Sequence, residues 1–116
     1  MPNGYSSDEP ARAEIDARRG PLLLEFGSDA CGHCRRAQPL IAQALAGHTP
    51  VPHLKIADGS GRPLGRSFEV KLWPTLVFLR DGNEVGRVVR PVDQAVVEAE
   101  LQRLVDAPGG GGEGKV

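Results

Sequence analysis

Residues 21–34 read Pro-Leu-Leu-Leu-Glu-Phe-Gly-Ser-Asp-Ala-Cys-Gly-His-Cys and join an apolar run to the only two cysteines of the 116-residue chain. The run over residues 21–26 is short and has little polar relief, which is typical of a strand buried on both faces. We therefore predict a central, parallel strand that leads directly to Cys31 and Cys34.

A helix is predicted to follow this strand, from His33 to about Ala46. Its apolar residues recur at the three- and four-residue spacing of one helix face. They are Ala37, Ile41, Ala44 and Leu45, with Leu40 beside them. Pro39 interrupts the pattern and predicts a kink.

Cys31 and Cys34 are separated by only two residues, Gly32 and His33. A disulfide across so short a loop removes little entropy from the unfolded chain, so reversible dithiol chemistry explains the pair better than a structural role. A helix N-terminus stabilises a thiolate, which favours Cys31 as the exposed nucleophile and Cys34 as the resolving thiol. Gly32 permits a tight entry to the helix, and a protonated His33 would favour the thiolate of Cys31.

The remaining segments predict an α/β domain in the order α-β-α-β-α-β-β-α, a mixed sheet with helices on both faces. A short opening helix lies between the cap candidates Ser7, Asp8 and Glu9 and the terminator Gly20, and Ile15, backed only by alanines, predicts light packing. A second strand covers residues 53–57, and a glycine-rich turn at 58–65 precedes a short helical segment near 66–68.

The second half predicts an antiparallel hairpin, with strands at 75–79 and 85–89 joined by Asp81-Gly82. Asp93 is the predicted cap of a last helix. The apolar stripe of this helix comprises Val97, Leu101, Leu104 and Val105. We divide the chain into an N-terminal extension (1–20), one domain (21–106) and a flexible glycine-rich tail (107–116).

Charge and hydropathy exclude several classes of partner. Fourteen basic and fifteen acidic side chains nearly cancel, so no nucleic-acid footprint is present, and no apolar run is long enough to span a membrane. The first twenty residues hold no signal-peptide core, so we expect a cytoplasmic protein. We also expect a monomer that needs no cofactor.

Several separated landmarks make the chain similar to the thioredoxin superfamily over residues 21–105. Glu25 lies six residues before Cys31, where the family carries a buried acid, and Pro39 lies five residues after Cys34, as does the family's helix proline. Trp73-Pro74-Thr75 resembles the segment with the cis-proline, and Asp81-Gly82 matches the following hairpin. Cys-Gly-His-Cys is the protein disulfide isomerase version of the motif, and Lys55 falls where thioredoxins place a lysine.

This resemblance implies a thiol-disulfide oxidoreductase acting on disulfide-containing proteins. Cys31 would attack the substrate disulfide and Cys34 would then release the reduced substrate. Glu25, with a raised pKa and modulated by Lys55, would take the proton of Cys34. Gly32 and the backbone around a cis Trp73–Pro74 bond, including Thr75, would contact an extended substrate.

Three departures from the family pattern bear on partners. Ala30 stands where the family has tryptophan, Pro91, preceded by Arg90, replaces a groove glycine, and the usual first strand is absent or very short. We therefore expect a sheet of four strands rather than five, while the substrate range stays open, including whether thioredoxin reductase accepts the protein.

Two alternatives stay open on the residues alone. A zinc site would need four ligands, and beyond Cys31, Cys34 and His33 only His48 and His53 are available, both interpreted as ordinary loop or strand residues. A redox-idle or redox-sensing binding module would use the same groove without turnover.

In a reducing compartment the pair would sit mostly as a dithiol, so reduction of substrates, with an unidentified electron donor, is the expected direction.

Overall fold

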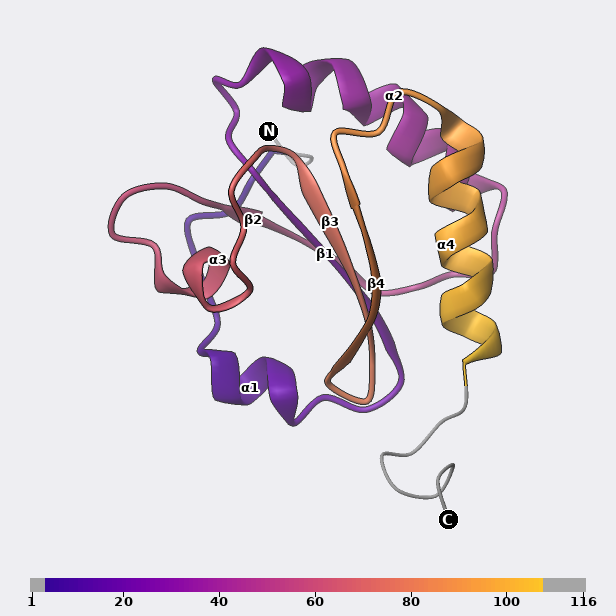
Figure 1. The fold of residues 1–116 in the computed structure, drawn as a ribbon, viewed down its shortest axis with the longest axis horizontal. Helices are drawn as coiled ribbons and strands as arrows, with labels where there is room; N and C mark the ends of the chain where they lie inside the picture. Colours follow the sequence, from indigo (N-terminus) through magenta and orange to yellow (C-terminus); the bar gives the residue numbers. More distant parts are fainter. Residues whose placement is uncertain (1–3, 108–116) are drawn as a thin grey trace.

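The computed structural model describes residues 4–107, which form a four-stranded sheet with helices on both faces (Figure 1). The strands lie in the order β2-β1-β3-β4. The elements in chain order are α1 (Arg12–Asp16), β1 (Pro21–Gly27), α2 (Gly32–Ala46), β2 (His53–Ala57), α3 (Pro63–Ser67), β3 (Thr75–Arg80), β4 (Asn83–Val89) and α4 (Gln94–Asp106). The predicted fold class and element order are confirmed.

β1 is central, as its apolar run predicts, and Leu22 to Gly27 are all buried. It pairs in parallel with β2 and antiparallel with β3, so the predicted parallel arrangement holds on one side only. Side chains alternate between the faces of a strand. Leu23 packs in the core of the α2 face, and Glu25, two residues on, points to that same face.

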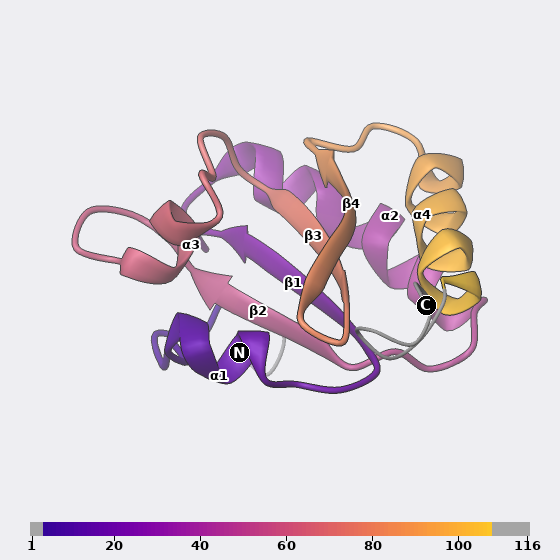
Figure 2. The same cartoon turned by 60° about the horizontal axis from the view of Figure 1, so that its bottom comes forward.

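Two separate cores cover the two faces of the sheet, and the turned view in Figure 2 shows α1 on the side away from α2. The first core joins α2 and α4 to the sheet through Leu23, Ala37, Ile41, Ala44, Leu76, Phe78, Val88, Val97, Leu101 and Leu104. The second joins α1 and α3 to the sheet through Ile15, Leu22, Leu24, Phe26, Ile56, Leu64, Phe68, Val77 and Leu79. Ile15 is only 1% exposed, so the expectation that α1 packs lightly is wrong.

The short helices begin at other residues than the sequence predicts. α1 starts at Arg12, and the carboxylate of Glu14 accepts a hydrogen bond from the backbone N–H of Ala11, so none of the predicted caps is used. α3 covers Pro63–Ser67 because Pro63 suits the first helical turn, one turn earlier than predicted. α2 runs unbroken through Pro39.

The C-terminal half follows its sequence signals. Asp81 and Gly82 both have positive φ, 52° and 81°, as the tight hairpin turn requires. The Asp93 side chain accepts a hydrogen bond from the N–H of Ala95 and caps α4, while Val105 is only partly buried. Residues 108–116 of the predicted tail (107–116) lie outside the described residues.

The N-terminal segment replaces a first strand by a single bridge. Ser6 pairs with Ile56 of β2, its N–H donates to the carbonyl of Lys55 and its carbonyl accepts from Ala57. The expectation of four strands is confirmed. This bridge holds the preceding residue, Tyr5, against the sheet end from which α2 begins.

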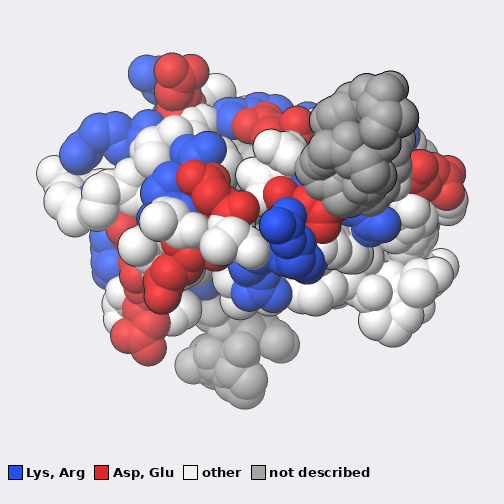
Figure 3. Space-filling view, turned by 90° about the horizontal axis from the view of Figure 1, so that it is seen from below, with Lys and Arg blue, Asp and Glu red and all other residues white. Residues whose placement is uncertain are grey.

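The face seen in Figure 3 carries intermingled basic and acidic side chains, without a large area of one sign. This distribution agrees with the near balance of charges in the sequence. Between residues 4 and 107, no helix is long and apolar enough to cross a membrane.

Candidate active site

The two cysteines lie where β1 ends and α2 begins. Cys31 is the N-cap of α2, and its sulfur accepts a hydrogen bond from the N–H of Cys34 at 3.3 Å. Cys31 is partly exposed, whereas Cys34, one turn into the helix, is 1% exposed. The predicted strand-to-helix placement of the pair is therefore present.

The environment of Cys31 favours its thiolate. Loss of hydration by itself raises the pKa of Cys31, but hydrogen bonds from the thiol and N–H of Cys34 and from the N–H of His33, with the charge of Arg90, together lower that pKa. A thiolate is the attacking form of a cysteine. Cys31 is thus the more reactive of the two thiols.

Cys34 has the opposite character. Burial, followed by its hydrogen bond to Cys31, raises the pKa of Cys34 to about 11. The thiol is therefore protonated at neutral pH, and it must lose a proton before it can attack. A proton acceptor near Cys34 is required by this shift.

Glu25 is the buried acid of the site, with no exposed surface. Three side chains donate to its carboxylate: Gln38 at 2.8 Å and Tyr5 to Oε2, and His53 at 2.9 Å to Oε1. Burial alone would raise the pKa of Glu25, but these hydrogen bonds outweigh it and lower the pKa. The expectation of a raised pKa is wrong, because the donors come from segments that the apolar run around Glu25 does not reveal.

Lys55 lies beside Glu25 in the register of β1 and β2, and Gln38 links the two side chains. The Lys55 ammonium donates to Oε1 of Gln38 at 2.6 Å, and Nε2 of Gln38 donates to Glu25. Gln38 was not a candidate from the sequence. Its position one turn after Cys34 on α2 is the only signal that places it here.

Tyr5 is a second residue that the sequence does not indicate. Its hydroxyl donates to Glu25 and lies beside the Cys34 thiol, whose pKa it lowers. Gly27 makes room for it, because a Cβ at position 27 would lie 2.6 Å from Cζ of Tyr5 and 2.7 Å from the sulfur of Cys34. Twenty residues separate Tyr5 from Glu25, so no local pattern could have joined them.

His53 is the third addition and is not an ordinary strand residue. It begins β2, and its partly exposed ring holds the buried carboxylate of Glu25 from the solvent side. His48, by contrast, contacts the carbonyl of its neighbour Thr49.

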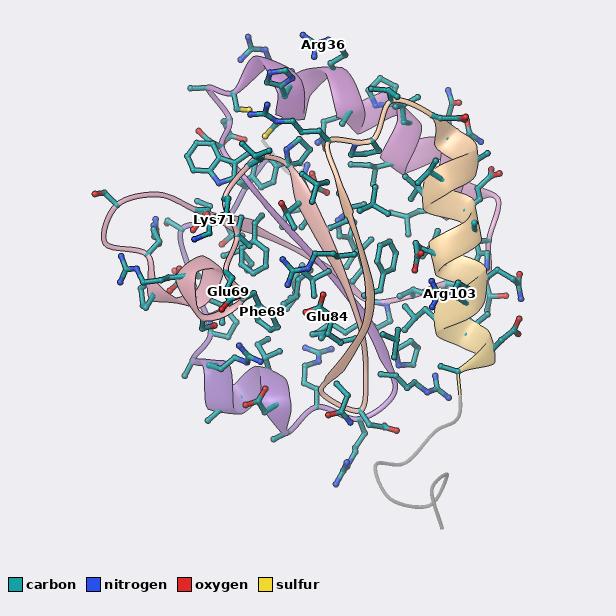
Figure 4. The ribbon with its side chains drawn as sticks, in the orientation of Figure 1. Arg36, Phe68, Glu69, Lys71, Glu84 and Arg103 are labelled. Carbon is teal, nitrogen blue, oxygen red and sulfur yellow. The ribbon has the colours of Figure 1, made fainter. Side chains whose placement is uncertain are left out.

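The His33 ring is turned towards Arg36, whose guanidinium donates to Nδ1 at 3.1 Å. A guanidinium has no acceptor, so Nδ1 of His33 is the acceptor in this contact. Figure 4 shows Arg36 on the outer side of α2, directed away from the sheet. The contribution of His33 to Cys31 comes from its backbone N–H, and a charge effect of its ring stays a prediction.

The segment Trp73-Pro74-Thr75 contains a cis Trp73–Pro74 bond, as the resemblance implies. Thr75 pairs with Phe26 at the end of β1, and its hydroxyl donates to the carbonyl of Leu72. Gly32, the first residue of α2, is exposed.

Arg90 connects this segment to the thiols. Its Nε donates to the carbonyl of Trp73 at 2.8 Å, its N–H donates to the carbonyl of Pro74, and its charge acts on Cys31. The Trp73 indole donates to Asp58 at 2.9 Å. The expected pairing of a substrate with the Trp73 backbone therefore competes with Arg90 at the carbonyl.

No group of three or more His, Cys, Asp or Glu side chains in the described part of the chain is placed to hold a metal ion. A reactive half-buried thiol, a protonated buried thiol and a buried carboxylate instead form a centre for dithiol–disulfide exchange. Fold and site together define a thiol-disulfide oxidoreductase of thioredoxin-like fold.

Comparison with known proteins identifies the family. The thioredoxin family model matches residues 5–103. The chain belongs to the thioredoxin family, and it is a thiol-disulfide oxidoreductase that acts on disulfide-containing proteins.

The similarity to individual relatives covers different shares of this chain and of theirs. The solved structure of thioredoxin 2 from Pseudomonas aeruginosa PAO1 in its reduced form is 56% identical, with a TM-score of 0.82, and the match covers 93% of this chain and all of that one. A thioredoxin of Chlamydia pneumoniae is 36% identical over 60% of this chain and 69% of its own length. Protein disulfide-isomerase A2 of Pongo abelii is 42% identical over 53% of this chain but only 13% of its own length.

Proposed function

We propose that this protein reduces disulfides of cytoplasmic proteins and so contributes to cell redox homeostasis. Its similarity to bacterial thioredoxins supports this direction, and so does its use of cysteine, since both cysteines belong to the motif and neither is available for a structural disulfide. A cytosolic glutathione pool would keep the pair as a dithiol, ready to donate electrons.

The observation that carries the proposal is the opposite character of the two thiols. Cys31 is accessible and has a lowered pKa, whereas Cys34 is buried and has a pKa of about 11. Such a pair reacts in a fixed order, since only Cys31 meets a substrate as a thiolate.

The reaction has two displacement steps. The Cys31 thiolate attacks one sulfur of the substrate disulfide, a mixed disulfide forms, and the other substrate sulfur leaves with the electron pair. Cys34 then loses its proton and attacks Cys31, and the second substrate sulfur leaves as a thiolate. The substrate gains two electrons, and Cys31 and Cys34 become a disulfide.

Glu25 is the proposed acceptor of the Cys34 proton. Because the pKa of its carboxylate is lowered and that of Cys34 is raised, the proton moves uphill if it moves first. The transfer is therefore concerted with sulfur attack, which removes negative charge from Cys34 as it develops. Lys55 acts through Gln38, which orients the carboxylate.

Substrates are proposed to bind in an extended form over Gly32, Trp73, Pro74 and Thr75. Arg90 covers the carbonyl of Trp73, so the free N–H groups and the shape of the groove contribute more than that carbonyl. The protein acts as a monomer, and a separate electron donor returns it to the dithiol.

Reduction of insulin by dithiothreitol tests the proposal, because precipitation of the free chains reports turnover. The wild type is expected to accelerate precipitation, Cys31→Ser to abolish the acceleration, and His48→Gln to leave it unchanged. Activity retained by Cys31→Ser, or a wild type no faster than dithiothreitol alone, contradicts the proposal. A glutathione titration of the pair gives the direction, since a potential nearer about −270 mV than about −180 mV marks a reductant.

A further inference from the structure

The hydroxyl of Tyr5 lies between the thiol that must lose a proton and the carboxylate that must gain one. It donates to Oε2 of Glu25, it accepts from Nε2 of Gln38 at 3.2 Å, and it lies beside the sulfur of Cys34 over Gly27, where its interaction with the thiol lowers the pKa of Cys34. A phenol has one donor and two acceptor positions, so with its donor on Glu25 and one acceptor position taken by Gln38, the second acceptor position is left for the S–H of Cys34.

The surroundings of Tyr5 keep the phenol neutral. Burial, followed by the charge of Glu25 beside it, raises the pKa of Tyr5 far above its ordinary value. A group that stays neutral cannot store the proton of Cys34. It can accept that proton on oxygen only while it gives its own proton away.

The ring is held in place by bonds from both sides of its segment. The N–H of Tyr5 donates to the carboxylate of Asp29 at 3.0 Å, and the bridge of Ser6 to β2 fixes the next residue. The Lys55 ammonium lies 4.8 Å from the ring centroid, and Gly27 leaves the space that the ring fills. The backbone and the ring of Tyr5 are therefore both held by contacts with other segments.

We propose that Tyr5 is a catalytic residue that carries the proton from Cys34 to Glu25, an inference that rests on the proposed function. As Cys34 attacks Cys31, its S–H proton moves to the Tyr5 oxygen and the Tyr5 O–H proton moves to Oε2 of Glu25. The bond between Cys31 and the substrate sulfur breaks, and the electron pair leaves on that sulfur. Tyr5 ends the step as it began, and Glu25 holds the proton until the site exchanges it with solvent.

A groove of about 390 Å³ beside Tyr5, Cys34 and Gln38 provides the competing route, because a water molecule there could take the proton directly. The two routes differ in the number of protons that move. Two protons move together through Tyr5, whereas the Tyr5→Phe variant, which lacks the hydroxyl, would keep only the route through water.

Reaction of the reduced protein with excess dithiobis(nitrobenzoate) separates the two displacement steps. The first coloured thiolate is released by attack of Cys31 at a rate proportional to reagent concentration. The second is released when Cys34 attacks the mixed disulfide, at a rate independent of reagent. Tyr5→Phe is expected to slow the second phase by about tenfold or more and to leave the first unchanged.

Mixtures of light and heavy water then distinguish proton transfer from packing. The second-phase rate of the wild type is expected to curve against the deuterium fraction, because two protons are in flight, and that of Tyr5→Phe to be linear. Tyr5→Leu, which also removes the ring, should lose the second phase at least as strongly. Ser67→Ala removes a hydroxyl from α3 and serves as the matched control, with both phases at wild-type rates.

Each result of these experiments decides for or against the role of Tyr5. An unchanged second phase in Tyr5→Phe overturns the inference, and water is then the acceptor. A slower phase with the wild-type curvature also overturns it, because Tyr5 would then act only by packing. Absence of a rapid first phase in the wild type contradicts the proposed function itself, independently of Tyr5.

Discussion

His53 and Glu25 form a contact across the parallel strands β1 and β2, with Nε2 of the ring 2.9 Å from Oε1 of the carboxylate. The His53 side chain is 21% exposed and that of Glu25 is 0% exposed. This ring is therefore the solvent-side support of a carboxylate that is otherwise held from within the domain.

Replacement of His53 by leucine should destabilise the protein by about 1–3 kcal/mol at neutral pH, because it leaves a buried carboxylate with one donor fewer. The pKa of Glu25 should rise in the variant. Urea unfolding measures the loss of stability. His48→Leu is the control, and an equal loss in both variants would show that the contact with Glu25 is not the cause.

Stability should fall in acid because the folded state lowers the pKa of Glu25 below its ordinary value of 4.5. Above pH 4.5 the carboxylate is ionised in both states and its contribution is complete, and it is lost as the pH falls through the lower, folded-state pKa. Urea unfolding between about pH 5 and pH 3 should show this loss in the wild type and a smaller one in Glu25→Gln. Equal slopes of the free energy of unfolding against pH in the two proteins would contradict this contribution of Glu25.

Titration of the reduced protein should show two separate thiolates in far-ultraviolet absorbance. Cys31 should ionise below its ordinary pKa of 9.0, and Cys34 at about 11. Cys34→Ala should remove the second step and raise the pKa of Cys31, since that sulfur loses the hydrogen bond from the Cys34 thiol. A single step that accounts for both thiols would rule out the division of roles.

Arg90→Gln should raise the pKa of Cys31, because the substitution removes a positive charge that contributes to its shift. Alkylation of Cys31 by iodoacetamide at neutral pH should slow by about two- to fivefold, as expected for a partly screened charge. Arg103→Gln provides the control, since Arg103 pairs with Glu100 on α4 at 2.9 Å, away from the thiols. An alkylation rate unaffected by Arg90→Gln would show that the charge of Arg90 does not lower the pKa of Cys31.

Gly27→Ala should destabilise the protein by about 1–3 kcal/mol, because its Cβ would overlap both the Tyr5 ring and the Cys34 sulfur. It should also slow the second phase of thiol release. Gly47→Ala is the matched control, because the nearest atom to a Cβ there is the carbonyl oxygen of Gln43 at 3.7 Å. Thermal unfolding compares the two, and equal melting temperatures would contradict the overlap.

Local signals predicted the fold well because each acts within a few residues. The apolar run at 21–26, the Asp81-Gly82 turn and the Asp93 cap all specify the backbone around them, and each is present. The start of α1 was misplaced because three residues before it could cap a helix, and the packing of Ile15 depends on a sheet face far along the chain.

The site was only half predictable for the same reason. The spacing of Cys31, Cys34 and Glu25 is a local property, but the pKa of Glu25 depends on Tyr5, Gln38 and His53. These residues come from the N-terminal segment, α2 and β2, and only tertiary structure brings them to one carboxylate. Burial alone predicts a raised pKa for Glu25. The hydrogen-bond donors, which the sequence does not reveal, lower that pKa instead.

The fit of the Tyr5 ring over Gly27 also constrains how the chain can evolve. The Tyr5 ring occupies the space that a side chain at position 27 would need. A larger residue at position 27 therefore requires both loss of the ring at position 5 and a shift of the Cys34 sulfur. The two positions should therefore covary among homologues. If the two positions change one at a time, the intermediate protein has either a steric overlap or a cavity beside Cys34.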